Sequence, residues 1–182
     1  MLKASLNESG TLTSNLSKVD LTDLPEPIYQ FRNRPQRTSE AKAAELIRRF
    51  DFYCKSDYSW SNPNGKGIPH DYQIDSSGEV VYDACTGLRW QKSGSPERLT
   101  FKRALAYIAQ LNRQKLGGHS DWRLPTLDEA MSLMEAKKQS NGLHINPIFD
   151  KTQDWIWTAD KESASRAWVV YFYVGGCDFS AV

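Results

Sequence analysis

The sequence predicts an α+β domain in which two helices pack on a small antiparallel sheet. A hairpin pattern at residues 79–91 precedes helical periodicities at 100–112 and 126–138, and β-rich segments follow at 156–158 and 167–174. This order is typical of helices segregated from an antiparallel sheet. Five of the six tryptophans lie in or beside these segments. Large aromatic side chains bury the most apolar surface, so the tryptophans mark a compact core.

The composition fits one domain of ordinary size with an extension. The chain has 182 residues, 40% of them hydrophobic, and a formal net charge of +1. Dedicated nucleic-acid-binding proteins usually carry a basic stripe, so we expect no nucleic-acid partner. The densest basic cluster predicts a solvated surface, with a phosphate or sulfated-sugar contact as the alternative. It comprises Arg32, Arg34, Arg37, Arg48 and Arg49.

No segment predicts a membrane span or a secretion signal. Apolar runs fall well short of the ~20 residues that a bilayer-spanning helix needs. Residues 1–15 are rich in Ser, Thr and Asn and lack the apolar stretch of a signal peptide. These features leave the localisation open.

Three regions are predicted along the chain. Residues 1–38 form an extended N-terminal arm, 39–71 a helix and a turn-rich loop, and 72–182 the α+β domain. The arm shows no helical periodicity, and its prolines interrupt helices and central strands alike. These are Pro25, Pro27 and Pro35.

Each predicted helix begins at a capping residue. Ser39 and Thr100 carry side-chain oxygens that accept hydrogen bonds from the free amides of a first turn. Thr126 and Glu129 match a capping box, from which a helix is expected to run to about Lys138. The helix after Thr100 has an apolar stripe at helical spacing. The stripe consists of Phe101, Ala104, Leu105, Ile108 and Leu111.

The segment SDWRLPT at residues 120–126 separates these two helices. Trp122 is expected to pack under the helices. Arg123 is expected to hold a loop through its planar fork of donors, with ligand binding as the alternative. Among the strands, residues 167–174 alternate poorly between polar and apolar, which predicts a central strand.

No cofactor or metal site is expected. Cys54, Cys85 and Cys177 are an odd, widely spaced set, which predicts three reduced thiols, with one bridge and one free thiol as the alternative in an oxidising compartment. The three histidines show no zinc-ligand spacing. Residues 60–71 resemble the centre of a calcium loop, but Trp60 at its first position offers no side-chain oxygen, so a plain turn is predicted.

The C-terminal run predicts a recognition surface for a protein or a glycan. Aromatic residues among small polar ones surround Gly175 and Gly176, a composition typical of antibody-like binding surfaces. An ordinary edge strand and loop is the competing interpretation. No pattern of catalytic groups is present, so no enzymatic activity is expected. The predicted ligand-binding residues are Trp168, Tyr171, Tyr173, Asp178, Phe179 and Ser180.

Four separated motifs resemble the bacterial Lcl C-terminal-like domain family. They are VYDACTGLRWQ at residues 81–91, GHSDWRLPT at 118–126, WIWT at 155–158 and AWVVYF at 167–172. The resemblance covers residues 72–182 and implies a C-type-lectin-like fold, with ligand binding or adhesion at a cell surface. Some members resemble targets of diversity-generating retroelements, which would vary the tail from Tyr171 onward.

Two departures from the family are visible. Members usually close with a further strand, so this domain is expected to lack its last strand. The Glu-Pro-Asn and Trp-Asn-Asp signatures of calcium lectins are absent, and a lectin-like fold does not by itself imply calcium-dependent sugar binding.

Two alternatives to ligand binding remain. The formylglycine-generating oxidases have a related fold and use cysteines, which would make Cys177 a candidate, although no second cysteine lies near it in sequence. A structural or assembly module would instead dock on a partner through residues 1–38.

Overall fold

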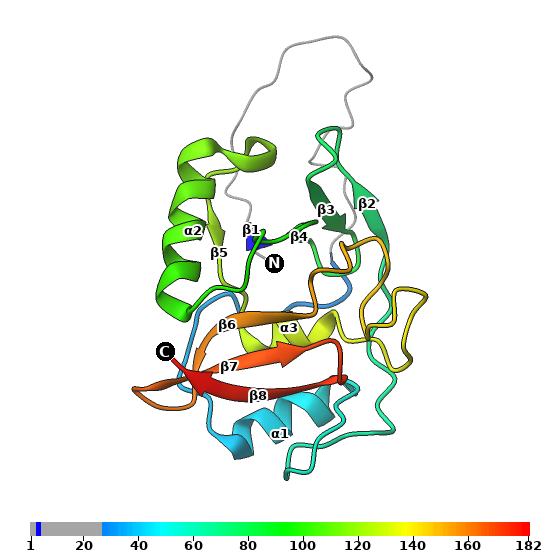
Figure 1. Cartoon of the computed structure of the whole chain (residues 1–182). Coiled ribbons are helices and arrows are strands. Elements are labelled where there is room, and N and C mark those ends of the chain that lie inside the picture. The colour runs from blue at the N-terminus through cyan, green and yellow to red at the C-terminus, as the bar shows by residue number, and fades with distance from the viewer. Residues whose placement is uncertain (1–2, 5–26) are drawn as a thin grey trace.

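The computed structural model describes residues 3–4 and 27–182, which form three α-helices and two antiparallel sheets (Figure 1). The α+β class predicted from the sequence is confirmed. The helices are α1 (Glu40–Arg49), α2 (Phe101–Gln114) and α3 (Leu127–Ser132), with a short 3-10 turn, η2 (Leu116–Gly118). The strands are β1 (Lys3–Ala4), β2 (Tyr72–Ile74), β3 (Val80–Asp83), β4 (Leu88–Gln91), β5 (Trp122–Arg123), β6 (Trp155–Lys161), β7 (Arg166–Tyr171) and β8 (Gly176–Ala181).

The larger sheet has the strand order β2-β3-β4-β1-β5. The predicted hairpin is confirmed as β3 and β4, which pair in register from Val80 opposite Gln91 to Asp83 opposite Leu88. Strand β1 lies between β4 and β5 and pairs with both. The remainder of the predicted arm, residues 1–2 and 5–26, lies outside the described residues.

The smaller sheet has the order β6-β7-β8, and β7 is buried on both faces. Trp168 and Val170 point into the larger apolar core, beneath α1 and α3. Ala167 and Val169 point into a second core against α2. The predicted central strand is thus confirmed, although β7 ends at Tyr171 and a turn leads into β8.

Strand β8 pairs with β7 along its whole length, from Gly176 opposite Tyr171 to Ala181 opposite Arg166. It forms an edge of the smaller sheet. The expectation that a further strand is missing stays a prediction.

Helices α1 and α2 begin at the capping residues that the sequence predicts. Ser39 and Thr100 accept hydrogen bonds from the amides three residues on, as predicted. In α2 the predicted apolar stripe is wrong at Leu105, which is 48% exposed. Helix α3 ends at Ser132 rather than near Lys138, because the Glu135 amide donates to the His144 carbonyl (3.0 Å) instead of continuing the helix.

Residues 27–38 of the predicted arm pack on the domain. The Thr38 amide donates to the Lys161 carbonyl (2.8 Å). The Arg32 guanidinium binds the buried Asp160 carboxylate, with Nη1 and Oδ1 2.7 Å apart. The Asp160 carboxylate also accepts from the Gln36 amide (2.8 Å) and from the Leu127 amide (2.7 Å) at the start of α3. This one side chain therefore joins the arm, β6 and α3.

Candidate ligand-binding site

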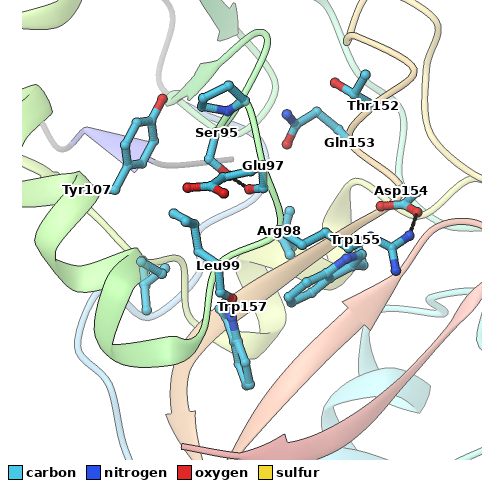
Figure 2. Close-up of a pocket in the computed structure, with 14 residues that line it drawn as sticks. Ser95, Glu97, Arg98, Leu99, Tyr107, Thr152, Gln153, Asp154, Trp155 and Trp157 are labelled. Atoms are coloured by element: carbon cyan, nitrogen blue, oxygen red, sulfur yellow. Dashed lines mark hydrogen bonds and ion pairs between the residues drawn. The ribbon is translucent and has the colours of Figure 1, made fainter.

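A cavity of about 310 Å³ opens between the loop of residues 93–99, helix α2 and the start of β6 (Figure 2). Its lining combines the rings of Trp155 and Tyr107 with the charged side chains of Arg98 and Asp154. Ligand sites are typically concave and apolar with a few placed polar groups. The cavity is at the lower end of the usual range of ~300–1,000 Å³, so it fits one terminal group of a larger ligand.

The loop of residues 93–99 is held in place from both sides. The Tyr107 hydroxyl donates to the Gly94 carbonyl (2.9 Å), and the Gln91 amide group donates to the same oxygen (2.9 Å). At the other end of the loop, the Trp157 indole donates to the Leu99 carbonyl (2.8 Å). These hydrogen bonds fix the wall of the pocket.

An ion pair between Arg98 and Asp154 lies at the mouth of the pocket. The Arg98 side chain is 74% exposed and the Asp154 side chain 26% exposed, so the pair contributes little to stability. Both side chains are available to a ligand's polar groups. The Asp154 carbonyl accepts from the amides of Phe172 (2.8 Å) and Tyr173 (3.3 Å), which fixes the rim against the end of β7.

Three rings next to the pocket form a continuous surface, which we call the aromatic patch: Trp155, Tyr171 and Tyr173. Trp155 and Tyr171 are direct partners across β6 and β7, with ring centroids 6.4 Å apart. Tyr173 meets Tyr171 edge to face at 5.7 Å. Because Trp155 also lines the cavity, the patch and the pocket are one site.

Asp178 lies beside the patch on β8. Burial, with smaller effects from the Asp178 carboxylate and Tyr173, raises the pKa of Tyr171. A tyrosine with a raised pKa stays protonated at neutral pH. Tyr171 is thus a hydrogen-bond donor or acceptor for a ligand, next to a carboxylate that only accepts.

The six residues predicted from the sequence divide between the two faces of the smaller sheet. Strand register places Asp178 and Ser180 of β8 opposite Val169 and Ala167, on the same face as Tyr171. Tyr173 lies in the turn after β7 and is 45% exposed. The register thus places three predicted residues on the α2-facing side of the sheet, and Tyr173 contacts Tyr171 from the turn at one end of it.

Trp168 does not belong to a surface, so this part of the prediction is wrong. Its side chain is fully buried, and its indole donates to the Thr38 carbonyl (2.8 Å). In this structure α1 and α3 cover one face of β7 and α2 covers the other, so Trp168 has no solvent-facing side. Phe179 also points away from the patch: it packs edge to face on Trp168 at 5.4 Å, and the Arg166 guanidinium lies 4.2 Å from its ring centroid.

Other candidate residues take structural roles. Arg123 binds the buried Glu129 carboxylate with two nitrogens, at 2.9 and 2.8 Å, as the structural interpretation predicts. In the loop that resembles a calcium loop, the Asn62 side-chain amide donates to the Phe52 carbonyl (3.0 Å). Within the described residues, no group of three or more His, Cys, Asp or Glu side chains is arranged to hold a metal ion.

Cys177 has a second cysteine beside it in the fold, although none lies near it in the sequence. Cys177 Sγ lies 3.9 Å from Cys54 Sγ. Both thiols are buried in the larger core rather than in the pocket.

The model of one protein family, the Lcl C-terminal domain, matches residues 79–181, more than half of the chain. The chain belongs to the Lcl C-terminal domain family. The match begins just before β3 and ends at the last residue of β8, so the pocket, the aromatic patch and both sheet faces lie within this Lcl C-terminal domain. Comparisons with curated proteins and with solved structures gave no match.

The sequence does not indicate four members of the site: Arg98, Tyr107, Asp154 and Trp155. The sequence places Trp155 with the other tryptophans in the core, and nothing local distinguishes it from the largely buried Trp157 two residues on. Arg98 and Asp154 are 56 residues apart and meet only through tertiary structure. None of the described helices combines the length and apolar character needed to cross a membrane.

Proposed function

We propose that this Lcl C-terminal domain is a non-enzymatic module that binds a protein or a glycan at the pocket and the aromatic patch. The observation that carries the proposal is the placement of Trp155, which lines the cavity and continues the patch through Tyr171. Exposed aromatic rings supply contact area with little loss of side-chain entropy, and adjacent polar groups orient a ligand.

The C-type-lectin-like fold is part of this proposal. Its support is the α+β arrangement, in which α2 and α3 lie against a small antiparallel sheet. Action at a cell surface and variation of the tail from Tyr171 onward are proposed from the family resemblance. Tyr173 and Val174 are each 45% exposed, so substitutions there would leave both cores intact.

Binding is tested by applying the full chain to an array of defined neutral, sialylated and sulfated glycans and to a panel of immobilised purified proteins. For any probe bound by the wild type, Tyr173→Ser and Trp155→Ala should each weaken binding at least about tenfold, because interface aromatics often contribute 2 kcal/mol or more. Tyr58→Ser is the matched control, since Tyr58 is also exposed (53%) but lies in the loop after α1.

The pattern of results separates the possible ligands. Glycan spots bound only by the wild type and the control variant would identify a glycan, and protein spots a protein ligand. Equal loss of binding in Tyr58→Ser, or full binding by both site variants, would refute this location. The melting temperature of each variant shows whether a loss of binding reflects unfolding.

The assembly alternative has less support. Arg32 and Thr38 contact the chain's own domain, so the described end of the arm is occupied within its own molecule.

A further inference from the structure

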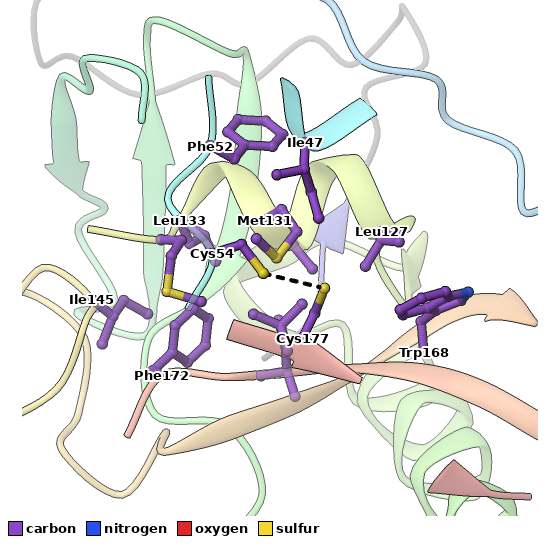
Figure 3. Close-up of a cluster of buried hydrophobic side chains, with 14 of the residues drawn as sticks. Ile47, Phe52, Cys54, Leu127, Met131, Leu133, Ile145, Trp168, Phe172 and Cys177 are labelled. Carbon is purple, nitrogen blue, oxygen red and sulfur yellow. Dashed lines mark hydrogen bonds between the residues drawn. The ribbon is translucent and has the colours of Figure 1, made fainter. Parts of the chain in front are cut away.

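Two cysteines that are 123 residues apart meet in the larger core. Cys54 follows α1, and Cys177 lies in β8 (Figure 3). Their sulfur atoms are 3.9 Å apart, and the residues are 0% and 3% exposed. In the structure both are free thiols.

The backbone holds these two segments together on both sides of the sulfur atoms. The Lys55 amide donates to the Gly175 carbonyl (2.7 Å), and the Trp60 indole donates to the Cys177 carbonyl (3.1 Å). A Cβ atom at Gly176 would lie 2.3 Å from the Lys55 carbonyl oxygen, so glycine allows the close approach. The proximity of the sulfurs is therefore built into the chain path.

We propose that Cys54 and Cys177 are a disulfide-forming pair that closes when the chain folds in an oxidising compartment, while Cys85 stays a free thiol. A disulfide requires about 2.05 Å between the sulfurs, so closure brings two sulfurs that are now 3.9 Å apart into bonding distance. This pairing resolves the two alternatives left open by the odd cysteine count. It is independent of the proposed ligand site, which lies on the other face of the smaller sheet.

The contact between the two thiols shifts their pKa values in opposite directions. The hydrogen bond with the Cys177 thiol lowers the pKa of Cys54, whereas this contact and burial raise the pKa of Cys177. The thiolate is the reactive species, and this opposite effect exists only while β8 is docked and the two thiols are in contact. Burial, together with the charges of Asp83 and Asp71, raises the pKa of Cys85, which makes that thiol a poorer competitor.

Closure proceeds by exchange with a small-molecule disulfide such as oxidised glutathione. While β8 is undocked, the thiolate of one cysteine of the pair attacks one sulfur of the reagent and expels a thiolate, which leaves a mixed disulfide on that cysteine. When β8 docks again, the thiolate of the other cysteine attacks the protein sulfur of the mixed disulfide and expels the second thiolate. The two cysteines together lose two protons and two electrons, and the reagent becomes two thiols.

The reagent reaches the pair when β8 is not docked. Strand β8 forms an edge of the smaller sheet and pairs there with β7, and edge elements open locally at lower cost than central ones. Once formed, the bond ties β8 to the segment after α1, which lies outside residues 79–181 of the family match. It thus fastens a preceding segment to the Lcl C-terminal domain.

The test refolds the full chain with oxidised and reduced glutathione, alkylates remaining thiols in denaturant, and determines the intact mass. The wild type should carry one alkyl group and Cys85→Ser none, and proteolysis without reductant should release one linked peptide pair containing Cys54 and Cys177. The oxidised protein should melt about 5–15 °C above the reduced protein, because a long closed loop constrains the unfolded chain. Amide exchange in residues 176–181 should slow on oxidation.

The wild-type measurement stands even if a cysteine variant does not fold. Three alkylated thiols after refolding with oxidised glutathione would overturn the proposal, as would a linked pair that contains Cys85. A bridge whose reduction leaves both the melting temperature and the exchange of β8 unchanged would refute its structural role.

Discussion

At the scale of single residues, the fold relies on a few buried carboxylates that collect several donors. Asp160 is fully buried and accepts from the Arg32 side chain and from two backbone amides, Gln36 and Leu127. Removing one partner of such a set leaves the others unsatisfied, which costs more than the set contributes in place.

We therefore expect Asp160→Asn to destabilise the protein by about 3–5 kcal/mol, because a neutral amide cannot accept on both sides. The free energy of unfolding in urea measures the loss. Asp57→Asn is the control: Asp57 is exposed, and such substitutions usually fall within about 0.5 kcal/mol. Similar values for the two variants would contradict this role of Asp160.

The raised pKa of Tyr72 leads us to expect a loss of stability at alkaline pH. Burial, with smaller effects from the charges of Asp83 and Glu135, raises its pKa well above the ordinary value. In the unfolded chain the Tyr72 hydroxyl ionises near pH ~10. The stability that its protonated form contributes is therefore fully present below pH ~10, and it is lost as the pH rises through the higher pKa of Tyr72 in the folded protein.

Tyr72→Phe should therefore flatten the decline of the unfolding free energy above pH ~10. Urea titrations at a series of pH values from neutral upward measure this slope. Tyr58→Phe, at an exposed position, should keep the wild-type slope. An unchanged slope in Tyr72→Phe would show that other groups determine alkaline unfolding.

At the scale of elements, α3 is short and depends on its first turn. The Glu129 carboxylate accepts from the Thr126 amide (2.9 Å), and the Thr126 hydroxyl donates to the Arg32 carbonyl (3.1 Å). Thr126 is buried, so water cannot replace the contact of its hydroxyl with the Arg32 carbonyl if the side chain is removed.

Thr126→Ala should cost about 1–2 kcal/mol of stability, at the upper end of the range for N-caps. Ser39→Ala at the exposed start of α1 should cost about 0.5–1 kcal/mol, since solvent can satisfy the freed amide there. Denaturant titrations of both variants check the order, and a larger loss in Ser39→Ala would reverse it.

The elements that sequence predicts well are those with local signals. Helices α1 and α2 and the β3–β4 hairpin follow from caps, periodicity and turn residues. The early end of α3 depends instead on the His144 carbonyl, and the exposure of Leu105 shows that no described element covers this part of α2. No local pattern in Lys3 and Ala4 indicates a strand, because β1 exists only through its partners β4 and β5.

The candidate site likewise contains residues that local sequence indicates and residues that only tertiary structure brings together. The composition after residue 170 indicates Tyr171 and Tyr173, whereas Trp168 is a false positive, because composition does not show that a strand is covered on both faces. The pocket itself joins the loops before α2 and before β6. Only tertiary structure shows that these loops meet.

At the scale of the whole molecule, residues 27–38 belong to the folded unit. They supply Arg32 to Asp160, and the Thr38 carbonyl accepts from the Trp168 indole (2.8 Å). Asp160 and Trp168 are both fully buried in the full chain, so removal of this segment takes away partners of two core groups.

A chain that starts at residue 39 should consequently be less stable than the full chain by at least about 3 kcal/mol, the cost of one broken buried ion pair. Thermal unfolding of the two chains measures this. In the shortened chain Asp160→Asn should cost less than in the full chain, because the charge has already lost its partner. An equally large cost in both would locate the effect outside this contact.

The alternation along β8 also bears on how such a protein changes over generations. Cys177 and Phe179 face the larger core, and Asp178 and Ser180 face the opposite side. If the proposed ligand-binding function holds, neighbouring codons of β8 experience different selection: folding constrains Cys177 and Phe179, and the ligand constrains Asp178 and Ser180. A lineage could then acquire new specificity within one strand while it inherits the framework unchanged.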